Sequence, residues 1–128
     1  MILQIDTHDA LPIYAQLRDQ IVLGIAAGRL ERGEGLPSVR RLAADLGINF
    51  HTVGKAYAAL CDEGYIVMDR RRGAVVARAA AGGEAFMARL GRSLTLSAAE
   101  AVCHEMGRDE FLEFCAKCYK NIGGGITT

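Results

Sequence analysis

The stretch of residues 36–57 constrains the fold of this chain more than any other, because it predicts two short helices separated by a glycine. Ser38 is a favourable N-cap residue, and Leu42 and Leu46 follow it at helical spacing. Gly47 supplies the left-handed backbone conformation that commonly ends a helix. Two helices joined by a short turn that contains glycine are typical of a helix-turn-helix.

The second helix of this pair has one apolar face and one polar face. Asn49 can cap it. The predicted buried stripe is Val53, Ala56, Tyr57 and Leu60. The outward residues near its N-terminus are Phe50, His51, Thr52 and Lys55. In a DNA-binding helix-turn-helix, outward residues at this place enter the major groove. A helical hairpin whose polar face is merely solvated is the alternative at this point.

An amphipathic helix is predicted ahead of the pair. Pro12 suits the first position of a helix, where its missing N–H costs nothing. Apolar residues then recur every four positions as far as about Ala27, and Gly28 ends the pattern. Residues 2–5 could form a short strand before this helix, and glycine and proline within residues 33–37 predict an irregular connection after it.

Two short β-prone runs, residues 65–68 and 74–77, follow the pair. The loop between them contains Gly73, so the two runs predict a β-hairpin. Three helices followed by a hairpin make a winged helix-turn-helix, which we predict for residues 1–78. The hairpin tip carries arginine at residues 70–72, and a DNA backbone would relieve their mutual repulsion. A solvated tip that keeps the protein soluble is the other interpretation.

Composition limits the class of protein further. Hydrophobic residues make up 51% of the 128 residues, enough for a packed core, and the net charge is zero. A neutral total argues against a polybasic DNA coat, although local basic clusters suffice for phosphate contacts. The sequence has no apolar run of membrane-spanning length, and residues 1–6 lack the features of a signal peptide. We therefore expect a cytoplasmic protein with four reduced cysteines.

The C-terminal part of the chain predicts two more helices. The first is expected to be one bent helix that ends at Gly107, although Gly91 and the capping-box sequence at residues 97–100 favour a break. The predicted segments are a hinge (79–83), the bent helix (84–106), a last helix (109–121) and a flexible end (123–128). The fold class is thus mainly α with a small β-hairpin: a winged domain followed by a two-helix region.

Apolar side chains recur along both of these helices, and two helices cannot bury so apolar a stripe by themselves. Pairing with a second copy would bury it, so we predict a dimerisation region over residues 84–122. Folding of the helices back onto the winged domain is the alternative. The predicted interface residues are Phe86, Leu90, Leu94, Val102, Phe111, Leu112 and Tyr119.

Cysteine and histidine in the tail raise a second interpretation. Thiolates three positions apart on a helix, with a further Cys and a His, could supply four zinc ligands or a redox switch. Free cysteine is also commonly a small buried hydrophobe, and we expect Cys61 in the core. We predict no metal or other cofactor and keep a metal- or redox-responsive regulator as the alternative. Its candidate residues are Cys103, His104, Cys115 and Cys118.

Four motifs together resemble the GntR family of bacterial transcription regulators, across roughly residues 10–78. The motifs are Pro12–Leu17, Gly28–Leu30, Leu36–Arg40 and Asn49–Tyr57. The short tail resembles the YtrA-type subfamily. This resemblance implies a homodimeric, usually repressing regulator that binds a palindromic operator in double-stranded DNA. The resemblance does not determine whether a small-molecule effector controls this regulator.

The resemblance also implies site residues. Ser38 and Arg40 match positions that contact DNA at the start of the domain's second helix. The reading helix would contribute His51, Thr52 and Lys55, and the wing Arg71 and Arg72. The full predicted set is Ser38, Arg40, Arg41, Asn49, Phe50, His51, Thr52, Lys55, Arg70, Arg71 and Arg72. Two departures stand out: Phe50-His51 replaces a frequent Pro-Asn, and Arg71 replaces the first glycine of the wing.

We expect no enzymatic activity. The sequence has no phosphate-binding glycine loop, nucleophile elbow or His-Glu-x-x-His helix, and its three histidines lie on separate segments. A winged helix used for protein–protein contact is one alternative, although such domains usually lack a basic wing and a polar reading helix. An architectural protein without sequence preference is another, and it would bind operator and random DNA alike.

Overall fold

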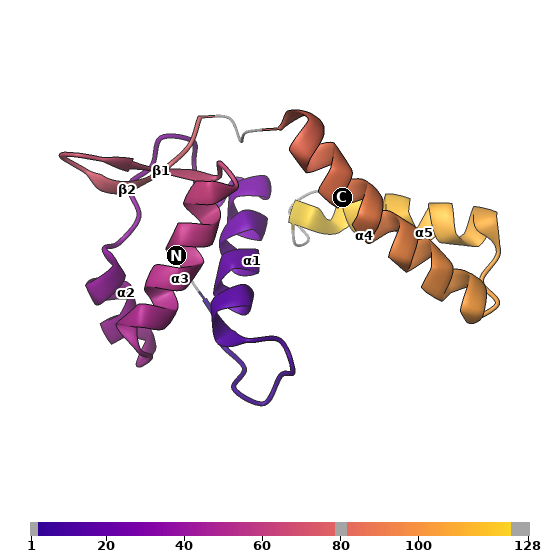
Figure 1. Cartoon of the computed structure of the whole chain (residues 1–128), viewed down its shortest axis with the longest axis horizontal. Helices are drawn as coiled ribbons and strands as arrows, with labels where there is room; N and C mark the ends of the chain where they lie inside the picture. Colours follow the sequence, from indigo (N-terminus) through magenta and orange to yellow (C-terminus); the bar gives the residue numbers. More distant parts are fainter. Residues whose placement is uncertain (1–2, 79–81, 124–128) are drawn as a thin grey trace. The chain divides into compact units, whose positions relative to one another are not determined.

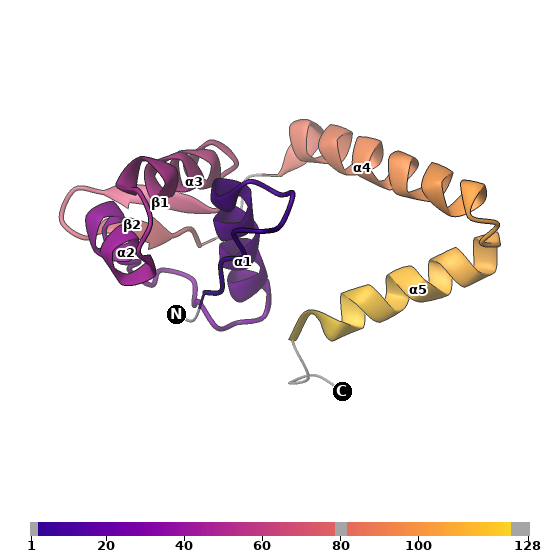
Figure 2. The same cartoon turned by 90° about the horizontal axis from the view of Figure 1, so that it is seen from below.

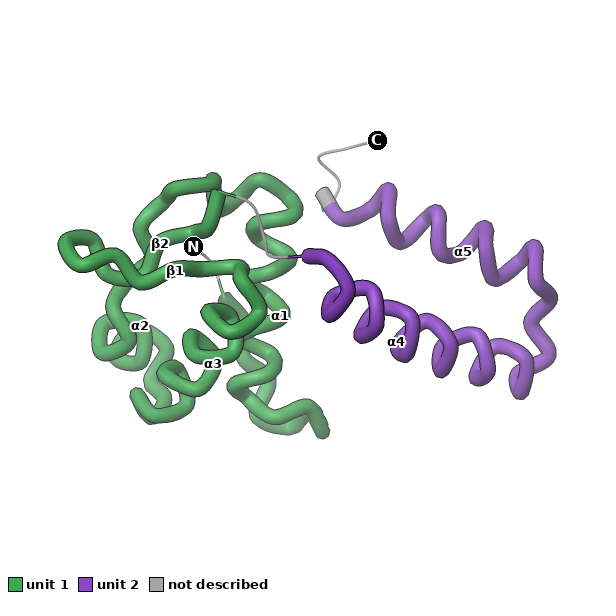
Figure 3. Tube along the Cα trace, turned by 45° about the horizontal axis from the view of Figure 1, so that its top comes forward, with its two compact units in different colours: residues 1–81 green, residues 82–128 purple. Residues whose placement is uncertain are grey.

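A computed structural model describes residues 3–78 and 82–123 of the chain. The chain divides into two units, residues 1–81 and residues 82–128, drawn in green and purple in Figure 3. Among the described residues, none of the helices is both long and apolar enough to span a bilayer.

The first unit is a three-helix bundle with a β-hairpin. Its elements are α1 (Ile13–Ala26), α2 (Val39–Leu46), α3 (Phe50–Asp62), β1 (Ile66–Asp69) and β2 (Gly73–Val76). Helix α3 packs against both α1 and α2, and β1 returns along its C-terminal end (Figure 1). This is the winged helix-turn-helix that the sequence predicts.

Helix α3 supplies the centre of the core. Val53, Ala56 and Leu60 are completely buried, and they meet Leu17 and Ile21 of α1, which are also completely buried. Their spacing along α3 is the apolar stripe read from the sequence, so that prediction is confirmed. The stripe fixes which face of α3 turns inward and therefore leaves the opposite face outside.

The predicted caps of α2 and α3 are also confirmed. The Ser38 hydroxyl accepts a hydrogen bond from the N–H of Arg41 at 3.1 Å, and the Asn49 side chain accepts one from the N–H of His51 at 2.8 Å. Gly47 ends α2 in the left-handed conformation, with φ of 69°. These three local devices set the angle between α2 and α3.

The connection before α2 contributes to the sheet, which the sequence does not predict. Strands β1 and β2 pair antiparallel, from Ile66 opposite Val76 to Asp69 opposite Gly73. On the other edge of β2, Gly35 forms a bridge with Val75, and the N–H groups of Gly33 and Leu36 donate to the β2 carbonyls of Val76 and Ala74. The hairpin is therefore anchored to the segment that leads into α2.

Two N-terminal predictions are wrong. Residues 3–6, the described part of the predicted strand and its continuation, form no strand. Instead the N–H groups of Gln4 and Asp6 donate to the side-chain amides of Gln20 and Gln16 on α1, at 2.9 Å in each case. Because side chains satisfy this backbone, no strand partner is needed. Pro12 is the N-cap of α1 rather than its first residue.

The second unit consists of α4 (Gly83–Cys103), α5 (Arg108–Lys120) and a short 3-10 turn (Asn121–Gly123). Helix α4 is continuous through Gly91, so the single helix is confirmed. It begins inside the predicted hinge, whose residues 79–81 lie outside the described part of the chain, as do residues 124–128. Its predicted end at Gly107 is wrong, because the helix stops at Cys103 and Glu105 takes a left-handed φ of 61°.

Helices α4 and α5 diverge from the turn that connects them (Figure 2). They share almost no contacts, and neither helix has a buried residue. Exposed apolar side chains are therefore common along them. The large ones are Met87, Leu90, Leu94, Leu96, Val102, Leu112, Phe114 and Tyr119.

Candidate nucleic-acid interface

The N-terminal ends of α2 and α3 lie next to each other and form a shallow hollow on the surface. Side chains of Arg40, Asn49, Phe50 and His51 line it. Every residue of the predicted DNA-binding set is exposed except Thr52, which is half-buried. The helix pair thus holds its hydrogen-bonding and basic groups where a double helix could reach them.

Phe50 contacts both Arg40 and His51 in this hollow. The guanidinium carbon of Arg40 lies 4.7 Å from the centre of the Phe50 ring, and the Phe50 and His51 ring centres are 4.2 Å apart. The first contact joins the first turn of α2 to the first residue of α3. It is a cation–π contact, which attracts a guanidinium to the face of an aromatic ring.

Lys55 lies one turn further along α3 and has a different aromatic neighbour. Its ammonium nitrogen is 4.0 Å from the centre of the Tyr14 ring in the first turn of α1. Tyr14 is not among the residues predicted for the site, because nothing local in the sequence connects positions 14 and 55. Only the packing of α1 against α3 brings the two together.

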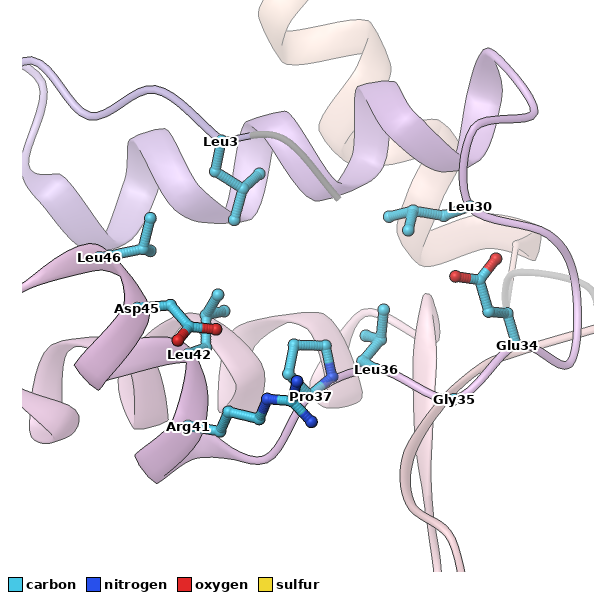
Figure 4. Close-up of a pocket in the computed structure, with 10 residues that line it drawn as sticks. All are labelled: Leu3, Leu30, Glu34, Gly35, Leu36, Pro37, Arg41, Leu42, Asp45 and Leu46. Carbon is cyan, nitrogen blue, oxygen red and sulfur yellow. The ribbon is translucent and has the colours of Figure 1, made fainter.

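Arg41 points to a different surface from Arg40. It lines a second hollow between α2, the N-terminal segment and the connection before α2, beside Pro37 and Asp45 (Figure 4). The floor of this hollow is made of leucine side chains, among them Leu36 and Leu42. Arg40 and Arg41 are adjacent in the sequence but therefore lie on separate faces of the winged unit.

The wing tip is closed by an aspartate that the sequence analysis does not single out. One carboxylate oxygen of Asp69 accepts hydrogen bonds from the N–H groups of Arg71 and Arg72, at 2.8 Å and 3.1 Å. These bonds lower the pKa of Asp69. Gly73 completes the turn with φ of 74°. Asp69 and Gly73 thus form the turn around the arginines at residues 70–72.

The arginines of the wing differ in their surroundings. The guanidinium of Arg72 donates to the carbonyl of Gly33 in the connection that borders β2. Arg70 and Arg71 are exposed at the tip. The Arg72 guanidinium is therefore bonded to the segment that borders β2, whereas Arg70 and Arg71 extend into solvent at the tip.

The tail carries three of the four cysteines, at residues 103, 115 and 118. Within residues 3–78 and 82–123, no three His, Cys, Asp or Glu side chains lie close enough together to hold a metal ion. Cys103 and Cys118 are exposed, and Cys115 is half-buried. Cys61 is half-buried at the edge of the core, and burial, with the nearby Asp62 carboxylate, raises the pKa of its thiol.

Comparison with known proteins identifies the family. Residues 10–76 match the family described as bacterial regulatory proteins, gntR family. The repressor YtrA of Bacillus subtilis is 40% identical over 74 residues, which are 58% of this chain and 57% of YtrA. The chain spans less than two thirds of the length of the first curated relatives that it matches.

Two solved structures are similar. YtrA from Sulfolobus acidocaldarius, a GntR-family transcription factor, is 42% identical with a TM-score of 0.61, covering 76% of this chain and 99% of that one. A transcriptional antiterminator from Listeria monocytogenes EGD-e is 25% identical with a TM-score of 0.90, covering 100% and 97%. The motifs, the winged fold and these matches agree: the chain belongs to the GntR family of bacterial transcriptional regulators, which are not enzymes.

Proposed function

We propose that this protein is a sequence-specific DNA-binding regulator that represses transcription in the bacterial cytoplasm. The name of one relative, the transcriptional repressor YtrA of Bacillus subtilis, supports the repressing role. Helix α3 would enter the major groove, and the wing would follow the adjacent backbone. One observation carries the proposal. The first turn of α2 and the start of α3 bring Arg40, Asn49 and His51 together around one hollow in the surface of a winged fold, and Lys55 is exposed one turn further along α3.

We further propose that the protein binds a palindromic operator as a homodimer. Leu94 and Leu112 are each 48% exposed and Val102 is 72% exposed, on helices that bury nothing of their own. A second copy is the partner that would cover the same face on both chains. A two-fold dimer places two reading helices on two half-sites, which is why the operator should be palindromic.

The experiment begins with selection of bound duplexes from a randomised DNA library. We expect an inverted repeat, bound at least a thousandfold more tightly than random DNA at fixed salt, as is typical of specific regulators. Equal affinity for selected and random DNA would instead identify an architectural protein. Sedimentation of the same preparation should give a dimer, and a monomer at micromolar concentration would contradict the second proposal.

Variants then test the assigned surface. We expect Arg40→Ala and Thr52→Ala to weaken binding to the selected duplex, the first also by reducing the salt dependence through loss of a charge. Arg92→Ala is a matched control, because this arginine is exposed on α4. Unchanged affinity of both test variants would remove the α2–α3 surface from the interface.

A further inference from the structure

Phe50 takes part in the proposed interface in a way that its own chemistry does not explain. A phenyl ring offers DNA no hydrogen bond, yet it is the first residue of the reading helix and is 39% exposed. The guanidinium carbon of Arg40 lies over this ring, 4.7 Å from its centre. The question is what this contact does.

We propose that Phe50 is a positioning residue that holds the Arg40 guanidinium in the orientation in which it contacts DNA. The proposal deepens the function proposed above and rests on it. A guanidinium that stacks on a ring uses its flat face, so its N–H donors, which lie around its edge, stay available to a guanine or a phosphate. An arginine that is already ordered loses less side-chain freedom when DNA binds.

The surroundings of Arg40 support this role. No ion pair in the described part of the chain involves Arg40, whereas Arg18 is held by Asp19 and Glu63. The caps of α2 and α3 fix the two backbones on which Arg40 and Phe50 stand. The Phe50 ring is thus the group that orders this arginine. Lys55 lies on Tyr14 instead, so its position does not depend on the ring at residue 50.

A double-mutant cycle on the full chain tests the proposal with the selected duplex. We expect Phe50→Leu to weaken binding about fivefold. Combined with Arg40→Ala it should cost almost nothing further, because the arginine that it orients is already absent. In the Lys55→Ala background, Phe50→Leu should still weaken binding about fivefold. Phe50→Tyr keeps the ring and should restore wild-type affinity.

Two results would overturn the proposal. The first is that Phe50→Leu binds the duplex as tightly as the wild type. The second is that Phe50→Leu still weakens binding by its full factor in the Arg40→Ala background, which would make the ring a direct contact with DNA. The melting temperature of each variant should stay within a few degrees of the wild type, because the side chain is partly exposed.

A measurement without DNA separates this proposal from the function on which it rests. The ring current of Phe50 should shift the Hδ signals of Arg40 upfield in the NMR spectrum of the free protein. Phe50→Leu should remove that shift, and Phe50→Tyr should keep it. Unshifted signals in the wild type contradict the stack itself. Shifted signals in a protein that selects no duplex would instead contradict the proposed function.

Discussion

The two units of this chain differ in where their apolar side chains lie. The winged unit surrounds α3 with a core that excludes solvent from Leu17, Val53 and Leu60 completely. The tail is two helices that diverge from one turn, with no buried residue on either (Figure 2). The first unit thus contains its own stabilising contacts, whereas the second exposes the side chains that would provide them.

This difference indicates how the two units are stabilised. Burial of apolar surface is the main favourable contribution to folding, and helices without it are marginal in water. The winged unit should therefore have a stability independent of protein concentration. The tail should gain its stability on association, so that its order depends on concentration. Paired substitutions of the same kind in the two units test this contrast.

Leu60→Ala should have the largest effect. Leu60 is completely buried, and removing its side chain leaves a cavity beside α1. We expect the free energy of unfolding of the winged unit to fall by about 3 kcal/mol. Urea denaturation followed at two protein concentrations should give the same loss at both. A loss below about 1 kcal/mol would show that the core tolerates the cavity.

Leu94→Ala makes the same change in the tail. Leu94 is half-exposed in the single chain, so the substitution should leave the unfolding of the winged unit unchanged. It should instead weaken dimerisation by about 2 kcal/mol, because a symmetric interface loses the side chain twice. Sedimentation equilibrium measures this change. A wild-type dimerisation constant in the variant would place Leu94 outside the interface.

Tyr57→Phe probes the join between the reading helix and the segment before α2. The Tyr57 hydroxyl donates to the carbonyl of Pro37 at 2.7 Å, and loss of this bond should cost about 1 kcal/mol of unfolding free energy. Burial raises the pKa of Tyr57 to about 12 from 10.0. The contribution of the neutral phenol is therefore complete below pH 10 and is lost as the pH rises towards 12.

Thermal melts across that range provide the check. The wild type should lose stability between pH 10 and pH 12 more steeply than Tyr57→Phe, which has no phenol at this position to ionise. Parallel pH profiles of the two proteins would contradict the assignment of this loss to Tyr57.

Local signals explain why much of this fold is predictable from the sequence. Ser38, Gly47 and Asn49 act within a few residues of themselves, and the apolar stripe of α3 is a periodic pattern, so all of these are legible along the chain. The continuous α4 follows from its repeat of apolar residues despite Gly91.

What the sequence does not predict depends on distant partners. The contact between Tyr14 and Lys55 exists only because α1 packs on α3, and the bridge from Gly35 to Val75 only because the hairpin folds back. The incorrect strand prediction has the same origin, since Gln20 of α1 accepts a hydrogen bond from the backbone of Gln4 and Gln16 of α1 accepts one from the backbone of Asp6. The exposure of the candidate residues other than Thr52 was therefore predictable, but the contacts of Phe50 with Arg40 and of Tyr14 with Lys55 were not.

The smallest expected effect has opposite signs for stability and for binding. Gly54 lies in the middle of the reading helix, and a methyl group added there would meet no atom within 4 Å. Glycine in a helix interior costs about 0.5–1 kcal/mol relative to alanine, so Gly54→Ala should stabilise the winged unit by that amount. If α3 lies in the major groove, the same methyl should collide with DNA and weaken binding to the selected duplex.

Gly91→Ala is the matched control in the tail. Gly91 is also inside a helix with open space around it, so alanine should stabilise α4 by a similar amount. It should leave the affinity of the dimer for DNA unchanged, because no DNA contact is assigned to the tail. Melting temperatures of the two variants measure the gain in stability, and their binding constants for the duplex show whether only Gly54→Ala weakens DNA binding. If Gly54→Ala is more stable and binds the duplex as tightly as the wild type, the DNA does not lie against this part of α3.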